Sequence, residues 1–279
     1  MSLKINKPLV SVAWLHTHLE NEKLIILDCT IPKVTADAFI SDEKMQIKGA
    51  LFFDIKDRFS DKKVALPNTL LSPEAFEEKA QELGIHKDAV LVCYDDIGMY
   101  ASPRVWWMFQ VMGFKNVVVL DGGLPEWKSK NFPIEKPVFH QPKIGNFKVD
   151  YQPEKLKHKK DVLKAIDNEQ VLIVDARSIG RFYGTAAEPR KDLKSGHIPN
   201  SVNLPFSEVH ENGKMKSATE LLEIFSSFKN KKEIIFTCGS GITAAILALG
   251  AAIAKLENVA VYDGSWTEWA STEGLPISK

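Results

Sequence analysis

The chain has 279 residues, of which 44% are hydrophobic, and its 36 basic residues balance its 36 acidic ones. This length suggests about two domains of roughly 100–200 residues each. The lack of a long basic run argues against nucleic acid as a partner. The longest apolar runs are far shorter than the roughly 20 residues that cross a bilayer, so we expect no membrane partner either.

The apolar run 8–15 near the N-terminus is followed by a histidine and polar residues without a cleavage-like site, so we expect no signal peptide. The cysteines Cys29, Cys93 and Cys238 are far apart, and none belongs to a CxxC pair. The sequence therefore predicts neither a disulfide framework nor a metal site, and a reducing cytoplasm is the expected location.

Strand-like and helix-like segments alternate along the first half of the chain. The apolar run 24–28 ends in an aspartate, as expected for a buried parallel strand whose carboxyl end reaches a loop. A helix is expected over 72–84, because a serine caps its start, a proline occupies its first turn and a glycine ends it. A second apolar strand follows over 89–95, with a helical segment after it.

The second half of the chain repeats this order. It has an apolar run over 171–175 that ends in an aspartate, a helical segment over 217–228 and an apolar strand over 232–238. Both halves also contain a segment in which Asp, Gly, Glu and Trp recur with the same spacing. The matching pairs are 24–30 with 171–177, 45–55 with 196–206, 89–95 with 232–238, and 120–127 with 262–269.

A repeat of about 140 residues is too long for a solenoid unit and indicates a duplicated domain. We expect a first domain over 1–135, a proline-rich linker over 136–153, and a second domain over 154–279. Alternating strands and helices predict the α/β class, with a mostly parallel sheet flanked by helices in each of the tandem domains.

Cys238 follows the strand 232–238 and opens the run Gly239-Ser240-Gly241-Ile242-Thr243, after which an alanine-rich helix is expected. Such a strand, loop and helix start bring backbone N–H groups together, and these favour an anion at their centre. A thiolate or a persulfide is then stabilised, and the sequence predicts an exposed, nucleophilic thiol. The alternative, a small packed core residue, is our interpretation of Cys29 and Cys93, which lie in apolar runs without a glycine loop.

The run from Cys238 to Ala244 resembles the active-site loop of the two-domain rhodanese superfamily, and it is most similar to the mercaptopyruvate sulfurtransferase branch. Blocks at 102–109, 119–127, 196–206 and 261–269 resemble family blocks in the same order. The resemblance implies tandem rhodanese domains of which only the second is active. Asp95 stands where the first copy would carry its cysteine, which implies that the first domain is catalytically silent.

The neutral residues Gly239 and Ser240 bear on the sulfur donor. Family members specialised for thiosulfate carry basic residues there, so the resemblance favours 3-mercaptopyruvate, with thiosulfate as the runner-up. Arg181 and Arg190 match the family arginines that clamp the donor, and a guanidinium suits a carboxylate in two-pronged contact. Their alternative roles are surface charges or structural ion pairs.

Further residues enter the expected site through the same resemblance. The loop residues Gly239, Gly241, Ile242 and Thr243 would line the substrate, and Tyr100 matches a family tyrosine that faces the cleft, although an ordinary core aromatic remains the alternative. No metal and no organic cofactor is expected.

The implied reaction has two half-reactions. Cys238 takes sulfur from the donor as a persulfide and releases pyruvate, and a thiol, thioredoxin or cyanide then takes the outer sulfur in ping-pong fashion. The expected partners are these small molecules or thiol proteins, and the expected state is a monomer or a weak dimer.

One departure concerns Ser240, which in relatives works with a histidine and an aspartate of the first domain. The resemblance places that histidine at Gln46, which cannot act as a base, and Asp37 stands near the place of the aspartate. Water, Lys48 or another group is left to supply the proton. His197 is interpreted as a structural residue tied to neighbouring backbone.

Other classes of function remain as alternatives. A dual-specificity phosphatase needs an arginine at a fixed spacing after the cysteine to hold phosphate, and here that position is Ala244. A non-catalytic persulfide carrier would retain Cys238 and stays open.

Overall fold

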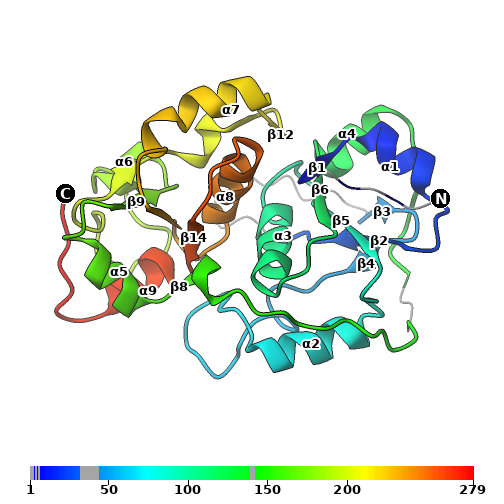
Figure 1. Ribbon diagram of the computed structural model, residues 1–279, viewed down its shortest axis with the longest axis horizontal. Helices are drawn as coiled ribbons and strands as arrows, with labels where there is room; N and C mark the ends of the chain where they lie inside the picture. Colours follow the sequence, from blue (N-terminus) through cyan, green and yellow to red (C-terminus); the bar gives the residue numbers. More distant parts are fainter. Residues whose placement is uncertain (1–2, 4, 6, 32–43, 139–141) are drawn as a thin grey trace. The chain divides into compact units, whose positions relative to one another are not determined.

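The computed structural model describes all residues except 1–2, 4, 6, 32–43 and 139–141 (Figure 1). The chain forms two compact units. Unit 1 comprises Met1–Asp61, Leu70–Tyr151 and Asn212–Met215, and unit 2 comprises Lys62–Thr69, Gln152–Glu211 and Lys216–Lys279. Each unit therefore includes a short segment from the other half of the sequence. Asp37 lies outside the described residues.

Unit 1 is built on a parallel sheet whose central strands are short runs of buried Leu, Ile and Val. Such continuous apolar runs suit a sheet that is covered on both faces. Asp28 ends one strand and pairs in register with Tyr94 of the next, so the chain after each strand emerges at the same edge. The order is β1 (Leu9–Val10), β6 (Val117–Leu120), β5 (Val90–Tyr94), β2 (Leu24–Asp28) and β4 (Leu51–Phe52).

Helices cover the two faces of this sheet (Figure 1). On one face, α1 (Val12–His18) and α4 (Gly123–Ser129) share a core with the strands. On the other, α2 (Pro73–Glu82) and α3 (Ser102–Val111) carry phenylalanines whose rings pack together. The prediction of a helix over 72–84 is confirmed, because Ser72 caps the helix start and Gly84 has the left-handed φ of 80° that ends it.

Unit 2 repeats the sheet. Its order is β10 (Val202–Asn203), β9 (Val171–Asp175), β13 (Glu233–Thr237), β14 (Val259–Tyr262) and β8 (Leu156–Lys157), all parallel. Each of these strands takes the place that its counterpart has in unit 1, read from β4 to β1. The predicted tandem α/β fold with parallel sheets is therefore confirmed.

The helices of unit 2 also lie on two faces. One face carries α5 (Lys159–Ala165) and α9 (Ser265–Ser271), which share a buried cluster with the strands, and α7 (Ala218–Ile224) packs against α8 (Ala244–Ile253). The helix expected over 217–228 is shorter than predicted. It ends at Ile224 and tightens into a 3-10 turn, η3 (Ser226–Phe228), where two serines weaken helix propensity.

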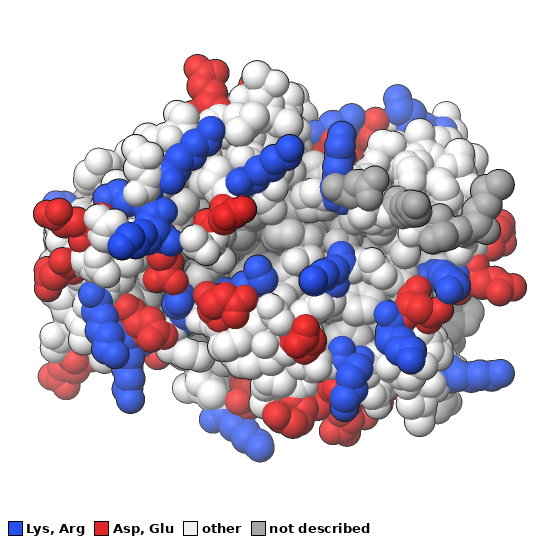
Figure 2. All heavy atoms as spheres, viewed as in Figure 1, with Lys and Arg blue, Asp and Glu red and all other residues white. Residues whose placement is uncertain are grey.

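The remaining elements are short. They are α6 (Ile179–Phe182), η1 (Pro153–Lys155), η2 (Phe206–Glu208), the strand pair β3 (Gln46–Ile47) with β7 (Ile134–Glu135), and the hairpin β11 (His210–Glu211) with β12 (Lys214–Met215). No helix in the described part of the chain is long and apolar enough to cross a membrane. On the face drawn in Figure 2, basic and acidic side chains are interspersed rather than gathered by sign.

The hairpin tip enters unit 1 through specific contacts. Asn212 and Gly213 have φ values of 51° and 75°, as a two-residue hairpin turn requires. The Met215 N–H donates to Asp121 Oδ1 at 3.0 Å, and the Lys214 ammonium lies 3.0 Å from Glu126. These contacts make residues 212–215 part of unit 1.

Candidate active site

Cys238 lies directly after β13, at the carboxyl end of the sheet, where α/β proteins bind ligands. The loop that follows leads into α8 at Ala244, as the sequence predicted. The thiol side chain is only 1% exposed, so the expectation of an exposed thiol was wrong.

Unit 1 shows what this kind of loop holds. Asp95 follows β5 at the position that Cys238 has after β13, and its carboxylate turns into its own loop. Its Oδ2 accepts hydrogen bonds from the backbone N–H groups of Tyr100, Ala101 and Ser102 at 2.8, 3.0 and 2.9 Å, and from the Ser102 hydroxyl at 2.7 Å. The loop form is thus an anion cradle, which unit 1 fills with its own carboxylate.

The loop in unit 2 has a matching backbone. Gly241 has a φ of 80° and its counterpart Gly98 has a φ of 105°, and both values belong to the region that favours glycine. The carbonyl of Cys238 accepts from a helix-start N–H at 2.9 Å, as the carbonyl of Asp95 does at 3.0 Å. Cys238 therefore follows its strand at the loop position that Asp95 has in the other copy.

Ser265 lies next to Cys238, a contact that the sequence analysis did not predict. Its hydroxyl accepts from the Cys238 N–H at 3.3 Å, donates to the Tyr262 carbonyl at 2.8 Å, and is 4.0 Å from the Cys238 sulfur. Ser265 has a φ of 50°, an uncommon conformation for a residue with a side chain. The counterpart in unit 1 is Gly123, with a φ of 52°.

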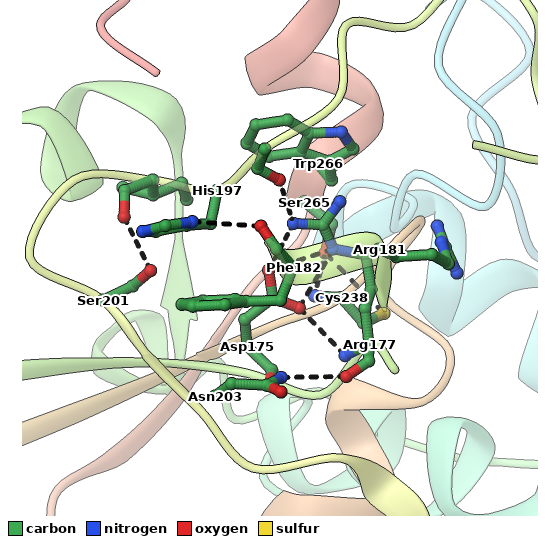
Figure 3. Close-up of polar contacts among 12 residues, drawn as sticks. Asp175, Arg177, Arg181, Phe182, His197, Ser201, Asn203, Cys238, Ser265 and Trp266 are labelled. Carbon is green, nitrogen blue, oxygen red and sulfur yellow. Dashed lines mark hydrogen bonds and ion pairs between the residues drawn. The ribbon is translucent and has the colours of Figure 1, made fainter. Parts of the chain in front are cut away.

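Arg181 lies against the cysteine loop (Figure 3). A side-chain carbon built on Gly239 would come 3.1 Å from Arg181 Nη2, so the missing side chain at 239 gives the guanidinium its place. Arg181 also donates to Glu188 through Nη2 at 2.6 Å and through Nε at 3.2 Å. The Arg181 side chain remains 24% exposed, so it can still reach a ligand.

A buried ionic network holds Glu188 in turn. Arg177 has no exposed side-chain surface and bonds to Glu188 at 2.8 Å and to Asp175 at 2.6 Å. Figure 3 labels Arg177 and Asp175. Its guanidinium lies 4.3 Å from the centre of the Trp266 ring. Since every charge in this group is paired, the network fixes the direction of Glu188 and hence of Arg181. The sequence predicted only the position of Asp175 at a strand end.

Arg190 reaches the same loop through Thr267. Its Nη1 donates to the Thr267 hydroxyl oxygen, and that hydroxyl donates to the Gly239 carbonyl at 2.6 Å. The structure thus brings Arg181 and Arg190, which are distant from Cys238 in sequence, to Gly239, the residue directly after Cys238.

Ser240 has a partner that the sequence interpretation missed. The Asn68 side-chain amide donates to the Ser240 hydroxyl at 3.2 Å. Gln46, which was expected at the histidine's place, is buried in unit 1, where its amide donates to the Ala50 carbonyl at 3.0 Å and to Glu135 at 3.2 Å. Its side chain is therefore committed to joining β3 and β7.

Replacing Asn68 with glycine is expected to lower kcat about fivefold, because a neutral hydrogen bond that orients the Ser240 hydroxyl contributes on the order of 1 kcal/mol. Glycine also keeps the left-handed φ of 58° that Asn68 adopts. Thr69→Val in the same segment is the matched control and should leave kcat unchanged. If Asn68→Gly also lowers kcat about fivefold in a protein that already carries Ser240→Ala, Asn68 does not act through Ser240.

The other predicted site residues fall in two places. Ile242 is 5% exposed, and Thr243 stands directly before α8 without a side-chain capping bond, so both belong to the cysteine loop. Tyr100 belongs to unit 1, where its backbone N–H takes part in the Asp95 cradle. His197 stacks on Phe182 at 3.9 Å and bonds to its carbonyl through Nδ1, which confirms a structural role.

The other two cysteines are core residues, as predicted. Cys29 and Cys93 have no exposed surface. Burial, together with the contact to Cys93, raises the pKa of the Cys29 thiol well above its ordinary value. A thiol in that setting stays protonated and is a poor nucleophile.

Comparison with known proteins supports the relationship that the site suggests. A rhodanese-like domain model matches residues 11–130 and 158–272. Curated 3-mercaptopyruvate sulfurtransferases from mouse and Escherichia coli are 39% and 36% identical, covering 94% and 96% of this chain and 92% and 96% of those proteins. The bovine thiosulfate sulfurtransferase is 37% identical, covering 94% of this chain and 92% of that protein.

Solved structures of related proteins support the same relationship. SseA from Escherichia coli, described as a 3-mercaptopyruvate sulfotransferase with the rhodanese fold, is 34% identical with a TM-score of 0.80, covering 94% of this chain and 99% of SseA. The Tum1 protein of Saccharomyces cerevisiae is 27% identical with a TM-score of 0.85, covering 99% of both chains. The chain belongs to the rhodanese family and carries the rhodanese-like domain twice.

Proposed function

We propose that this protein is a sulfurtransferase that moves sulfur from 3-mercaptopyruvate, through a persulfide on Cys238, to a thiol or cyanide acceptor. The observation that carries the proposal is the cradle around Cys238. Its counterpart in unit 1 holds the Asp95 carboxylate with several short N–H bonds, so a loop of this form suits a thiolate and a persulfide anion at the same point.

In the first half-reaction, the Cys238 thiolate attacks the sulfur of the donor. The carbon–sulfur bond breaks, its electron pair remains on carbon as the enolate of pyruvate, and a proton converts the enolate to pyruvate. Cys238 keeps the outer sulfur as a persulfide. In the second half-reaction, an acceptor thiolate or cyanide attacks that outer sulfur and releases the Cys238 thiolate, which gives ping-pong kinetics.

The preference for 3-mercaptopyruvate rests on where positive charge lies. Gly239 and Ser240 leave the loop itself neutral, and the cations come from Arg181 and Arg190 beside Gly239. Planar guanidinium groups beside the cysteine loop suit a donor with a carboxylate and a ketone. Thiosulfate is the second candidate, because one related protein is named for that donor alone and two others are named for both donors.

Ser240 and its partner contribute to this chemistry without a strong base. An asparagine amide cannot remove a proton from the serine, so Asn68 orients the hydroxyl, and water completes the protonation of the enolate. The domain with Asp95 in place of cysteine forms no persulfide, because a carboxylate cannot carry sulfane sulfur. The free cysteines suit a reducing compartment such as the cytoplasm, and thioredoxin or a small thiol suits the role of acceptor.

Steady-state kinetics with each donor test this function. We expect kcat/KM for 3-mercaptopyruvate to exceed that for thiosulfate by about tenfold or more, with pyruvate released in step with sulfur transfer. Equal or reversed values would overturn the donor assignment. Formation of a persulfide without release to any thiol or cyanide would instead indicate a carrier protein.

A further inference from the structure

We propose that Thr267 is a positioning residue that fixes Arg190 relative to the cysteine loop and thereby sets how well the donor carboxylate is held. The inference rests on the proposed function, in which Arg190 binds the donor. Thr267 itself touches no reacting atom. It acts through Arg190 and through the Gly239 carbonyl.

The contacts of Thr267 converge on one point of the loop. Its backbone N–H donates to the Gly239 carbonyl at 3.0 Å, and its hydroxyl donates to the same oxygen at 2.6 Å. Thr267 is 8% exposed, so water has little access to these bonds. The first turn of α9 is thereby fastened to the residue directly after Cys238.

The direction of the hydrogen bonds follows from the chemistry of a hydroxyl. Its single proton goes to the Gly239 carbonyl, so the oxygen acts as the acceptor for Arg190 Nη1. A guanidinium has further N–H donors in the same plane, so this bond orients the plane while leaving donors for a carboxylate. The hydrogen bond to a charged group is also stronger than a neutral one.

Unit 1, which has Asp95 in place of the cysteine, lacks the counterpart of these Thr267 contacts. In the paired segments 120–127 and 262–269, the counterpart of Thr267 is Pro125. Proline has neither a hydroxyl nor a backbone N–H, so neither bond to the loop carbonyl can form there. The difference coincides with the replacement of the cysteine by Asp95, which agrees with a role for Thr267 in donor binding rather than in the fold that both copies share.

Two variants of near-constant shape test the role of the hydroxyl. Thr267→Val removes the hydroxyl and is expected to raise KM for 3-mercaptopyruvate roughly tenfold, with kcat within about threefold, because a hydrogen bond to a charged group is lost. Thr267→Ser keeps the hydroxyl and should restore KM. KM for thiosulfate should change by less than about threefold in both. Thr272→Val, the same replacement at the end of α9, is the matched control and should leave every constant unchanged.

A double-mutant cycle with Arg190→Ala decides whether Thr267 acts through that arginine. Thr267→Val in the Arg190→Ala background should add less than about twofold to KM, since the partner is already gone. An unchanged KM in Thr267→Val, or a full tenfold effect in both backgrounds, would overturn the inference. A wild-type protein that does not turn over 3-mercaptopyruvate would overturn the proposed function instead, so the two failures are distinguishable.

Discussion

Replacement of Cys238 with serine is expected to abolish sulfur transfer, with kcat falling by more than roughly 1000-fold for either donor. Serine keeps the shape of the side chain, but its alkoxide is far less accessible at neutral pH and cannot carry sulfane sulfur as a persulfide does. The Cys238 carbonyl and N–H contacts to α9 remain in place, so the variant should fold. The loss is measured as initial rates of pyruvate release.

The other cysteines supply the control. Cys93→Ala removes a thiol that is fully buried in unit 1 and far in sequence from the loop. Its activity per folded molecule should equal that of the wild type. Substantial turnover in Cys238→Ser, or its loss in folded Cys93→Ala, would show that the nucleophile has been misassigned.

The arginine clamp gives the second large effect. Arg181→Ala and Arg190→Ala should each lower kcat/KM for 3-mercaptopyruvate by roughly 10- to 100-fold, mainly through KM, because each removes a charge-assisted bond to the donor. The decrease in kcat/KM for thiosulfate should be several-fold smaller. Steady-state kinetics with both donors give the comparison.

Lys191→Ala is the matched control, because Lys191 is an exposed cation next to Arg190 and isolated surface charges contribute little. Glu188→Gln distinguishes the effect of the orientation of Arg181 from the effect of its positive charge. It removes the ion pair that directs Arg181 while leaving the guanidinium present, so it should raise KM less than Arg181→Ala does. Equal losses for both donors in the arginine variants would mean that these residues support the fold rather than the donor.

Much of the architecture could be predicted from sequence, because it depends on local patterns. Apolar runs that end at Asp28 and Asp175 predicted parallel strands, and both residues end strands in the structure. The paired blocks predicted the duplication, and the sheets repeat it in strand order. The glycines after Cys238 predicted a loop and a helix start, which the structure contains.

What escaped prediction depends on contacts between residues far apart in the chain. Asn68 reaches Ser240 across more than half of the sequence, and nothing near either residue indicates the pairing. In the sequence, Thr267 and Ser265 are ordinary residues at the start of a helix. Only the structure shows that their hydroxyl groups bond to Gly239 and Cys238. The burial of Cys238 was also not predicted, because the sequence of a glycine-rich loop does not show which distant residues cover it.

The exchange of segments between the two halves has the same origin. Residues 62–69 and 212–215 are short connections without a strong hydrophobic pattern, and each is part of the unit built mainly from the other half. Their placement is decided by a few polar contacts, such as that of Asp121 with the Met215 N–H. The hydrophobic periodicity of the sequence does not predict such contacts.

The central claim, that Cys238 carries the transferred sulfur, is tested most directly by intact-protein and peptide mass spectrometry after treatment with 3-mercaptopyruvate. We expect one added sulfur atom, located on the peptide that contains Cys238, and its loss when a thiol acceptor is added. An unmodified Cys238, or added sulfur on Cys29 or Cys93 instead, would contradict the account.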